Sequence, residues 1–214
     1  MGNRRTRLEV TESNRRGVLE AARGQFLDKG FHGASLDAIA EEAGFSKGVV
    51  YSQFGSKNEL FLALLAERIE QRREHTRELA ASLSGPDGVE ALARDAMGVS
   101  ADSAAWQALL LEFRAHAARN AALNDRYLAL HRRTIAYVSE ILADLFERGG
   151  SPPPLPLAML ATLFLALGTG LTAELLVDPG LDVRAMASHV ARALGALVSQ
   201  APQAPAARRI RRNA

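Results

Sequence analysis

The chain of 214 residues contains no cysteine, and only 6% of its residues are aromatic. The absence of cysteine excludes disulfide bonds, thiolate metal sites and cysteine nucleophiles. The five histidines show neither the His-Glu-x-x-His spacing nor another paired metal-binding spacing, so we expect no metal and no cofactor. Runs that alternate apolar and polar residues are also missing, whereas apolar residues recur at helical spacing throughout. The sequence therefore predicts an all-α protein.

A large excess of charge is missing too, because 26 basic and 24 acidic residues leave a net charge of +2. Affinity for nucleic acid would therefore depend on local placement of charge. Residues 1–12, with Arg4, Arg5 and Arg7, are predicted to be a flexible basic arm, which either reaches DNA or is an ordinary disordered terminus. Residues 200–214, rich in Ala, Pro and Arg, are predicted to be a disordered basic tail.

Residues 1–25 alternate charged and apolar side chains and lack a continuous apolar run, so we expect a cytoplasmic protein without a signal peptide. One uncharged stretch, residues 155–173, is 19 residues long and reaches the length of a membrane span. Pro156 at its start, two internal glycines and Glu174 at its end favour a buried or subunit-interface helix instead. We therefore expect no contact with a membrane.

The segment 35–61 predicts two short helices, a glycine-containing turn between them and a third helix directly behind. Ser35 is a suitable N-cap for the first helix, and Gly44 can end it in the left-handed conformation. Ser46 is the predicted cap of the second helix, and a Ser-x-x-Glu capping box that begins at Ser56 opens the third. This arrangement is typical of a helix-turn-helix, which lays its second helix in the major groove of DNA. The residues assigned to its core are Phe26, Ile39, Ala40, Val50, Phe54 and Leu60.

The same segment resembles the DNA-binding domain of the TetR/AcrR family of bacterial transcriptional regulators. The matching pattern is Ile39-Ala40-x-x-Ala43-Gly44-Phe45-Ser46-x-Gly48-x-x-Tyr51-x-x-Phe54-x-x-Lys57-x-x-Leu60. Phe45 stands where the family usually has a smaller aliphatic residue, and Val49 where a threonine is frequent. The resemblance implies a helix-turn-helix domain in residues 13–62 and a larger helical domain for effector binding and dimerisation in residues 63–199.

The predicted second helix offers polar side chains to double-stranded operator DNA. Lys47 can bind guanine and Gln53 can pair with adenine, whereas Val49 keeps only a methyl contact with thymine. Tyr51 and Lys57 match family positions that hold phosphates, although Tyr51 could instead be a buried core aromatic. The complete predicted set is Ser35, Ser46, Lys47, Gly48, Val49, Tyr51, Ser52, Gln53 and Lys57.

Behind this domain, the pattern predicts a long helix to about residue 83 and a break at residues 84–88. Further helices follow at about 88–99, 103–118, 121–148, 155–177 and 182–199. The last two are rich in Leu and Ala and are predicted to form an αα-hairpin whose surplus apolar surface pairs with a second copy. Gly168 and Gly170 would allow close helix approach in this homodimer.

The middle helices mix aromatic and polar residues on faces expected to point inward, which fits either a ligand pocket or a packed core. Met159 is among the residues expected on these inner faces. The stretch from residue 106 to residue 133 also resembles the effector domain of the choline-responsive branch of the family. The predicted pocket for an unidentified small-molecule effector is formed by Trp106, Leu110, Phe113, His116, Tyr127, His131, Phe164 and Thr169.

Two other classes of function stay open at this point. An all-α enzyme would need a constellation such as Glu112 paired with Glu174, or a dinucleotide site at the Gly-x-Gly-x-x-Ala of residues 168–173, which lacks a strand before it. An architectural DNA-binding protein would have a filled body without a pocket. We favour a homodimeric, ligand-responsive repressor without catalytic activity.

Overall fold

A computed structural model of the chain describes residues 7–97 and 101–199. Within these ranges every element is a helix and no strand is present, which confirms the all-α prediction. The helices are α1 (Arg7–Gly33), α2 (Leu36–Glu42), α3 (Lys47–Phe54), α4 (Lys57–Ala80), α5 (Gly85–Ala96), α6 (Ala101–Ala117), α7 (Ala121–Gly149), α8 (Leu157–Val177) and α9 (Val183–Ser199).

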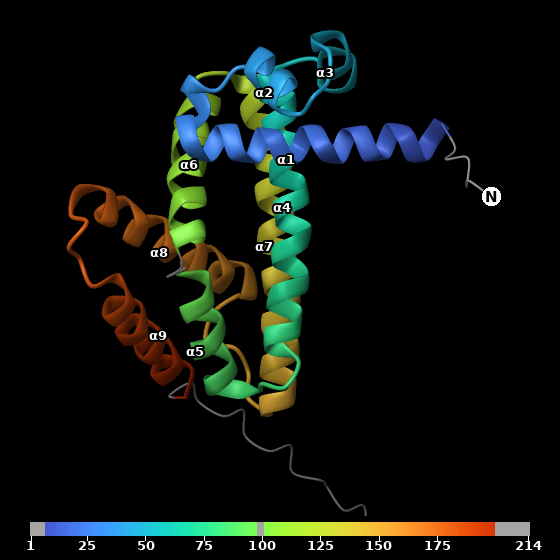
Figure 1. Ribbon diagram of the computed structural model, residues 1–214. Helices are drawn as coiled ribbons and strands as arrows, with labels where there is room; N and C mark the ends of the chain where they lie inside the picture. The colour runs from blue at the N-terminus through green and yellow to red at the C-terminus, as the bar shows by residue number, and fades with distance from the viewer. Residues whose placement is uncertain (1–6, 98–100, 200–214) are drawn as a thin grey trace, which may run out of the picture.

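Helices α1, α2 and α3 form a small head at one end of the molecule, and α4 and α7 run from it along the length of the body (Figure 1). Because α1 begins at Arg7, the prediction of a flexible arm over residues 1–12 is wrong for residues 7–12; Arg4 and Arg5 lie outside the described residues. At its other end, Gly30 adopts φ 71° and ψ 172°, which interrupts the regular helix. The chain can therefore turn from α1 towards α2 within a few residues.

The junction between head and body is a continuous helix rather than a linker. Helix α4 runs without a break across residues 62 and 63, where the sequence placed the domain boundary. The predicted break at residues 84–88 is shorter than expected, because Ser84 is the N-cap and Pro86 lies in the first turn of α5. Proline is well tolerated there, since the first amides of a helix have no partner within it.

The last two helices do not form the hairpin that the sequence predicted. Helix α9 packs chiefly along α5, and its contact with α8 is small (Figure 1). Gly168 allows α8 to pack closely on α5 within the chain, because a Cβ at this position would lie 2.5 Å from the carbonyl oxygen of Ala96 in α5. At Gly170, by contrast, a Cβ would have no neighbour within 4 Å.

A cluster of buried phenylalanines joins head and body. Phe26 and Phe31 of α1 stack with ring centroids 5.9 Å apart, and Phe31 meets Phe113 of α6 edge-on at 5.1 Å. Phe61 of α4 stacks on Phe113 at 4.2 Å. All four side chains are almost completely buried. Since interiors pack densely and resist gaps, a shift of α6 or α4 must be felt by α1 and hence by the head.

Candidate nucleic-acid interface and ligand cavity

The head has the capping geometry that the sequence predicted for a helix-turn-helix. The Ser35 hydroxyl accepts a hydrogen bond from the Ala38 amide at 3.2 Å, and the Ser56 hydroxyl accepts one from the Glu59 amide at 3.2 Å. Gly44 and Gly55, with φ of 73° each, lie beyond the ends of α2 and α3 in a conformation that disfavours other residues. The predicted core residues are confirmed as buried: Phe26, Ile39, Ala40, Val50, Phe54 and Leu60.

Helix α3 turns one side towards solvent, and the predicted base-reading residues lie on that side. We call this side the recognition face. Tyr51 is 49% exposed, so it is not a core residue. Val50 and Phe54, by contrast, anchor the opposite side of α3 in the head. The recognition face consists of Ser46, Lys47, Gly48, Val49, Tyr51, Ser52 and Gln53, of which Val49 and Gln53 are partly buried.

Two residues of the recognition face differ in detail from the sequence prediction. Ser46 occupies the N-cap position of α3, but its hydroxyl makes no capping hydrogen bond. The Gln53 Oε1 atom is buried without a hydrogen-bond partner. Pairing with adenine uses both the oxygen and the nitrogen of the amide, so Gln53 would need a different rotamer to make it.

Lys47, at the first turn of α3, forms an ion pair with Asp37 of α2 at 2.5 Å. The hydrogen bond and charge of Asp37 raise the pKa of Lys47, which keeps its ammonium group protonated. Both side chains are well exposed, and pairs of this kind are weak in water. The ammonium group can therefore be shared with a base or a phosphate at little cost.

Lys57 lies at the joint between α1 and α4 rather than on the open surface. Its Nζ donates hydrogen bonds to the carbonyl oxygens of His32 at 3.2 Å and Ala34 at 3.0 Å, and it sits 4.8 Å from the ring centroid of Phe31. Partial burial lowers the pKa of Lys57. The ammonium group has three donors, so one donor is left for a phosphate. The structure thus adds a structural role for Lys57 that the sequence did not indicate.

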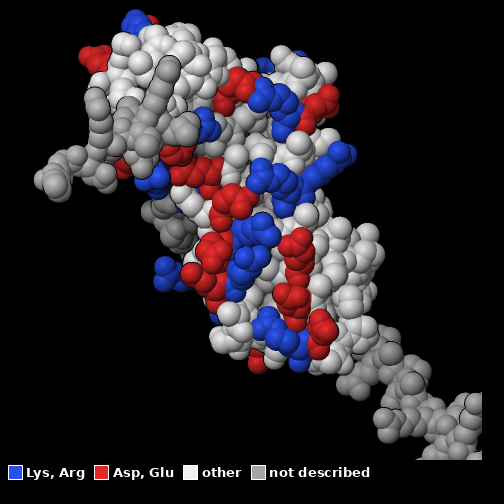
Figure 2. All heavy atoms as spheres, turned by 90° about the vertical axis from the view of Figure 1, so that its right-hand side faces the viewer, with Lys and Arg blue, Asp and Glu red and all other residues white. Residues whose placement is uncertain are grey.

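The long face formed by α4 and α7 has a different character. Acidic and basic side chains alternate over it (Figure 2), for example in the pairs Arg133–Glu70 at 2.5 Å and Arg73–Glu140 at 3.6 Å. These pairs neutralise the charge locally. Over its described residues, this face therefore resembles an ordinary solvated surface more than a nucleic-acid surface.

The body has a cavity of about 130 Å³, partly open to solvent, between α4, α5, α6, α7 and α8, which we call the central cavity. Trp106, Leu110 and Phe164 give it apolar walls, and several polar side chains reach into it. Six of the eight predicted pocket residues line it: Trp106, Leu110, Tyr127, His131, Phe164 and Thr169.

The other two predicted pocket residues lie outside the lining, at the joint between head and body. Phe113 is fully buried in the phenylalanine cluster. His116 faces α4 and α1: its Nε2 lies 3.2 Å from the Asn58 Oδ1, and its ring lies 5.5 Å from that of His32. Both residues share a helix with the true lining residues, and periodicity alone does not separate adjacent sides of one helix. Met159 is also misplaced by the sequence, because it is 51% exposed.

Arg114 lines the central cavity and is hydrogen-bonded to two other polar residues of the lining. It donates a hydrogen bond through Nε to the Tyr127 hydroxyl of α7, and another to the Thr169 hydroxyl of α8 at 3.3 Å. Burial, followed by the charge of Arg114, lowers the pKa of the neighbouring His131. Burial also raises the pKa of the Tyr137 hydroxyl. His131 and Tyr137 are therefore neutral near pH 7.

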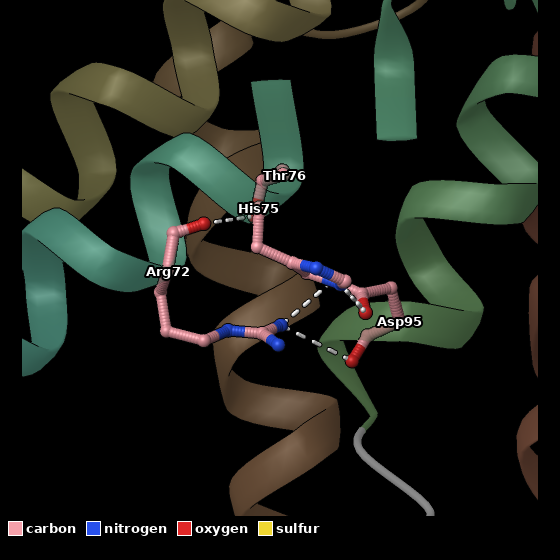
Figure 3. A network of polar contacts seen from close by, with 4 residues as sticks. All are labelled: Arg72, His75, Thr76 and Asp95. Atoms are coloured by element: carbon pink, nitrogen blue, oxygen red, sulfur yellow. Dashed lines mark hydrogen bonds and ion pairs between the residues drawn. The ribbon is translucent and has the colours of Figure 1, made fainter. Parts of the chain in front are cut away.

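Four residues of α4 and α5 form another polar network, and three of them, Arg72, Thr76 and Asp95, line the cavity (Figure 3). Arg72 and Asp95 form an ion pair at 2.6 Å, and His75 approaches the other Asp95 oxygen at 3.1 Å. The Thr76 hydroxyl donates to the Arg72 carbonyl at 2.7 Å. Sequence reasoning missed Arg72 of α4 and Asp95 of α5 as lining residues. No local signal could have paired two residues on different helices.

The features that would support an enzyme are not assembled. Residues 168–173 lie inside α8, so their Gly-x-Gly-x-x-Ala pattern does not form a strand-to-helix turn. Glu112 accepts a hydrogen bond from the Phe31 amide at 2.9 Å, and Glu174 lies exposed on α8. Within the described residues, no three His, Asp or Glu side chains are grouped to hold a metal ion.

Helix α8 is long and apolar enough to cross a membrane by length and composition, the one helix of the described residues that is. Only 33% of its most apolar window is buried within the chain. Its exposed residues Met159, Leu163 and Ala166 recur at helical spacing and carry no charge. In the single chain, this apolar stripe is exposed to solvent.

Comparisons with known proteins agree with this geometry. The family model described as bacterial regulatory proteins, tetR family, matches residues 18–64. A second model, BetI-type transcriptional repressor, C-terminal, matches residues 85–199. The HTH-type transcriptional regulator UidR of Escherichia coli K12 is 27% identical over 175 residues, which cover 82% of this chain and 86% of that protein.

Solved structures show the same fold. A TetR-family regulator from Rhodococcus aligns with a TM-score of 0.72 at 22% identity, over 87% of this chain and 99% of that one. Salmonella enterica GusR aligns with a TM-score of 0.66 at 24% identity, over 92% and 100%. FadR from Bacillus subtilis, solved in complex with stearoyl-CoA, aligns with a TM-score of 0.66 at 17% identity, over 86% and 97%.

Proposed function

Because this chain belongs to the TetR family of bacterial transcriptional regulators, we propose that it is a homodimeric repressor released from its operator by a small molecule in the central cavity. It acts in the cytoplasm and has no catalytic activity. Residues 13–62 form the DNA-binding domain, and residues 63–199 bind the effector and dimerise. The observation that carries the proposal is the joint between them, where α6 contributes both to the cavity wall and to the phenylalanine cluster beneath the head.

The recognition face enters the major groove of the operator. Lys47 leaves its weak pair with Asp37 to contact a base, Val49 contacts a thymine methyl group, and Tyr51 donates its hydroxyl to a phosphate. A dimer places two such faces on half-sites about 34–36 Å apart or a multiple of this distance. The proposed DNA contacts are Ser35, Ser46, Lys47, Gly48, Val49, Tyr51, Ser52, Gln53 and Lys57.

The dimer forms through α8 and α9. The apolar stripe of α8 and the open space at Gly170 allow a second copy of α8 to approach closely. Met186 of α9 is also exposed and extends the surface. Since the same surface on both copies would meet, the contact has two-fold symmetry. Covering this surface removes the apolar area that a single chain leaves in water.

The effector acts by favouring one of two arrangements of the body. A ligand between α6, α7 and α8 stabilises an arrangement whose two heads do not match the half-site spacing. Effector and DNA therefore weaken each other's binding by the same factor. The contact between Glu112 and the Phe31 amide lies on the route from the cavity wall to the head.

Binding to the DNA upstream of its own gene, and to fragments from a genomic selection, tests the proposal. We expect sequence-specific, salt-sensitive binding by two protomers per site, and Tyr51→Phe should weaken it without changing the preferred sequence. Arg132→Met, on the exposed side of α7, is the control. Binding without sequence preference would support an architectural protein, and failure of both DNA sources would refute the regulator function.

The dimer has a separate test. Leu163→Glu places a charge in the apolar stripe and should shift the protein towards monomer in sedimentation experiments. Ala118→Glu makes the same kind of change at an exposed position at the end of α6 and should leave the dimer intact. A dimer that survives Leu163→Glu would show that the contact lies elsewhere.

A further inference from the structure

We infer that the central cavity binds a small organic acid, with the carboxylate held by Arg114 between Tyr127 and Thr169 and the apolar body against Trp106 and Phe164. This inference rests on the proposed function, because it names the chemistry of the effector. It follows from the charges that face the cavity, from the way Arg114 is held and from the size of the space.

The charged side chains that line the cavity are mostly positive. The guanidinium groups of Arg68, Arg72 and Arg114 face it, and that of Arg68 lies over the Trp106 ring, 5.5 Å from its centroid. Asp95 is the one carboxylate among the described residues of the lining. The Asp95 carboxylate is already paired with Arg72 and contacts His75. Asp95 therefore does not offset the charge of Arg114, and a charge without a counter-ion in a mainly apolar cavity is unfavourable, so the site favours an anionic guest over a neutral or cationic one.

Arg114 carries the charge that a ligand would meet. Its hydrogen-bond partners are two neutral hydroxyls, those of Tyr127 and Thr169, and the described residues form no ion pair with it. His131, whose pKa is lowered by burial and by the charge of Arg114, stays neutral near pH 7. A guanidinium group offers a planar fork of donors that matches a carboxylate, and the hydroxyls hold this fork in place.

The same contacts explain how an acid would act on the body. Arg114 comes from α6, Tyr127 from α7 and Thr169 from α8, so one carboxylate would join three helices. A neutral ligand would contact the apolar walls but would leave the charge of Arg114 unpaired. The recognition of the charge is therefore coupled to the positions of these helices.

The volume of the cavity matches that of a small acid. A cavity of about 150 Å³ lined by apolar side chains is known to accommodate benzene, and the central cavity has about 130 Å³. The space therefore fits an aromatic or short aliphatic monocarboxylate. A quaternary ammonium ligand, which the resemblance to the choline-responsive branch would suggest, would find aromatic side chains in the lining, but it would meet the charge of Arg114 without a free carboxylate to offset it. Asp95, the carboxylate of the lining, is committed to other cations.

The experiment is a titration of the full-length protein without DNA, followed by the fluorescence of Trp106, the single tryptophan, and by calorimetry. The probes are benzoate, phenylacetate and butyrate, their neutral amides, and choline. We expect at least one acid to bind with a dissociation constant in the millimolar range or tighter, and its amide to bind about 10- to 100-fold more weakly. Because DNA is absent, failure of the proposed repressor function would not affect this result.

Three variants assign the binding to Arg114. Arg114→Met should bind the acid about as weakly as the wild type binds the amide, and Arg114→Lys should bind the acid with intermediate affinity. Tyr127→Phe, which removes one hydroxyl from the fork, keeps the test available if Arg114→Met does not fold. Arg132→Met lies on the exposed side of α7 and should bind like the wild type. Equal binding of acid and amide, tighter binding of choline, no binding of any acid, or unchanged binding in Arg114→Met would each overturn the inference.

Discussion

Gly30→Ala should loosen the joint between head and body, for two reasons that the structure separates. At φ 71° and ψ 172°, Gly30 has a conformation that is almost restricted to glycine, and forcing another residue into it costs about 1–3 kcal/mol. The new Cβ would also lie 2.9 Å from both carboxylate oxygens of Glu112. This contact is too short, so the flexible Glu112 side chain must move away.

Moving Glu112 breaks its hydrogen bond with the Phe31 amide, which is 2.9 Å long. Because Glu112 is exposed to water, we assign this bond about 0.5–1.5 kcal/mol. The sum of strain and lost bond predicts that Gly30→Ala lowers the free energy of unfolding by about 1.5–4.5 kcal/mol. Glu112→Ala alone should cost only the bond, about 0.5–1.5 kcal/mol.

A double-mutant cycle distinguishes the two contributions. In Gly30→Ala the bond to Glu112 is already lost, so adding Glu112→Ala should cost nothing further. Gly44→Ala serves as the comparison for strain alone, since Gly44 has φ 73° and a Cβ there would meet no atom within 4 Å. Urea unfolding, at one fixed protein concentration because the protein is proposed to be a dimer, measures all the variants. A cost below about 1 kcal/mol for Gly30→Ala, or simple addition of the two single effects, would refute the reasoning.

Other parts of the structure give further predictions. Gly168→Ala should lower the free energy of unfolding by about 1–3 kcal/mol, since its Cβ would lie 2.5 Å from the Ala96 carbonyl oxygen. Gly170→Ala lacks this clash and is the control in urea unfolding. The pKa of His131 in the folded protein lies below its usual value of 6.5. The neutral imidazole therefore stabilises the folded protein fully above about pH 6.5, and this stabilisation is lost as the pH falls through the folded pKa. His131→Gln should flatten this dependence in unfolding measured from pH 5 to about 7.5. Lys57→Ala should weaken operator binding for all DNA sequences and reduce the slope of log affinity against log salt concentration by about one phosphate contact. An unchanged slope would mean that Lys57 contacts backbone carbonyls and no phosphate.

The helix-turn-helix could be predicted from the sequence because its determinants are local. Caps such as Ser35 and Ser56 satisfy amides two or three residues away, and Gly44 permits a backbone angle that other residues avoid. The exposed side of α3 follows from helical periodicity once Val50 and Phe54 are assigned to the core. Sequence alone thus determined the fold class and the exposed side of α3.

The joint and the cavity depended on contacts between distant segments. Helix α9 was expected on α8, but it packs chiefly on α5, and its small residues Ala187 and Ala191 are completely buried. Phe113 and His116 were assigned to the pocket, but they contact α1 and α4. Helical periodicity identifies a buried side of α6 but not which neighbour covers it.

The charge pattern of the central cavity was likewise decided by tertiary structure. Arg72 and Asp95 lie 23 residues apart and meet only because α4 and α5 pack together. Arg114 lies on the same helix as the predicted pocket residues Trp106 and Leu110, but its contacts with Tyr127 and Thr169 come from two other helices. Capping and periodicity act within a few residues of one helix, and so the sequence determines them directly. The neighbours of a buried charge depend on how whole helices pack, and for this protein only the three-dimensional arrangement shows that the cavity suits an acid.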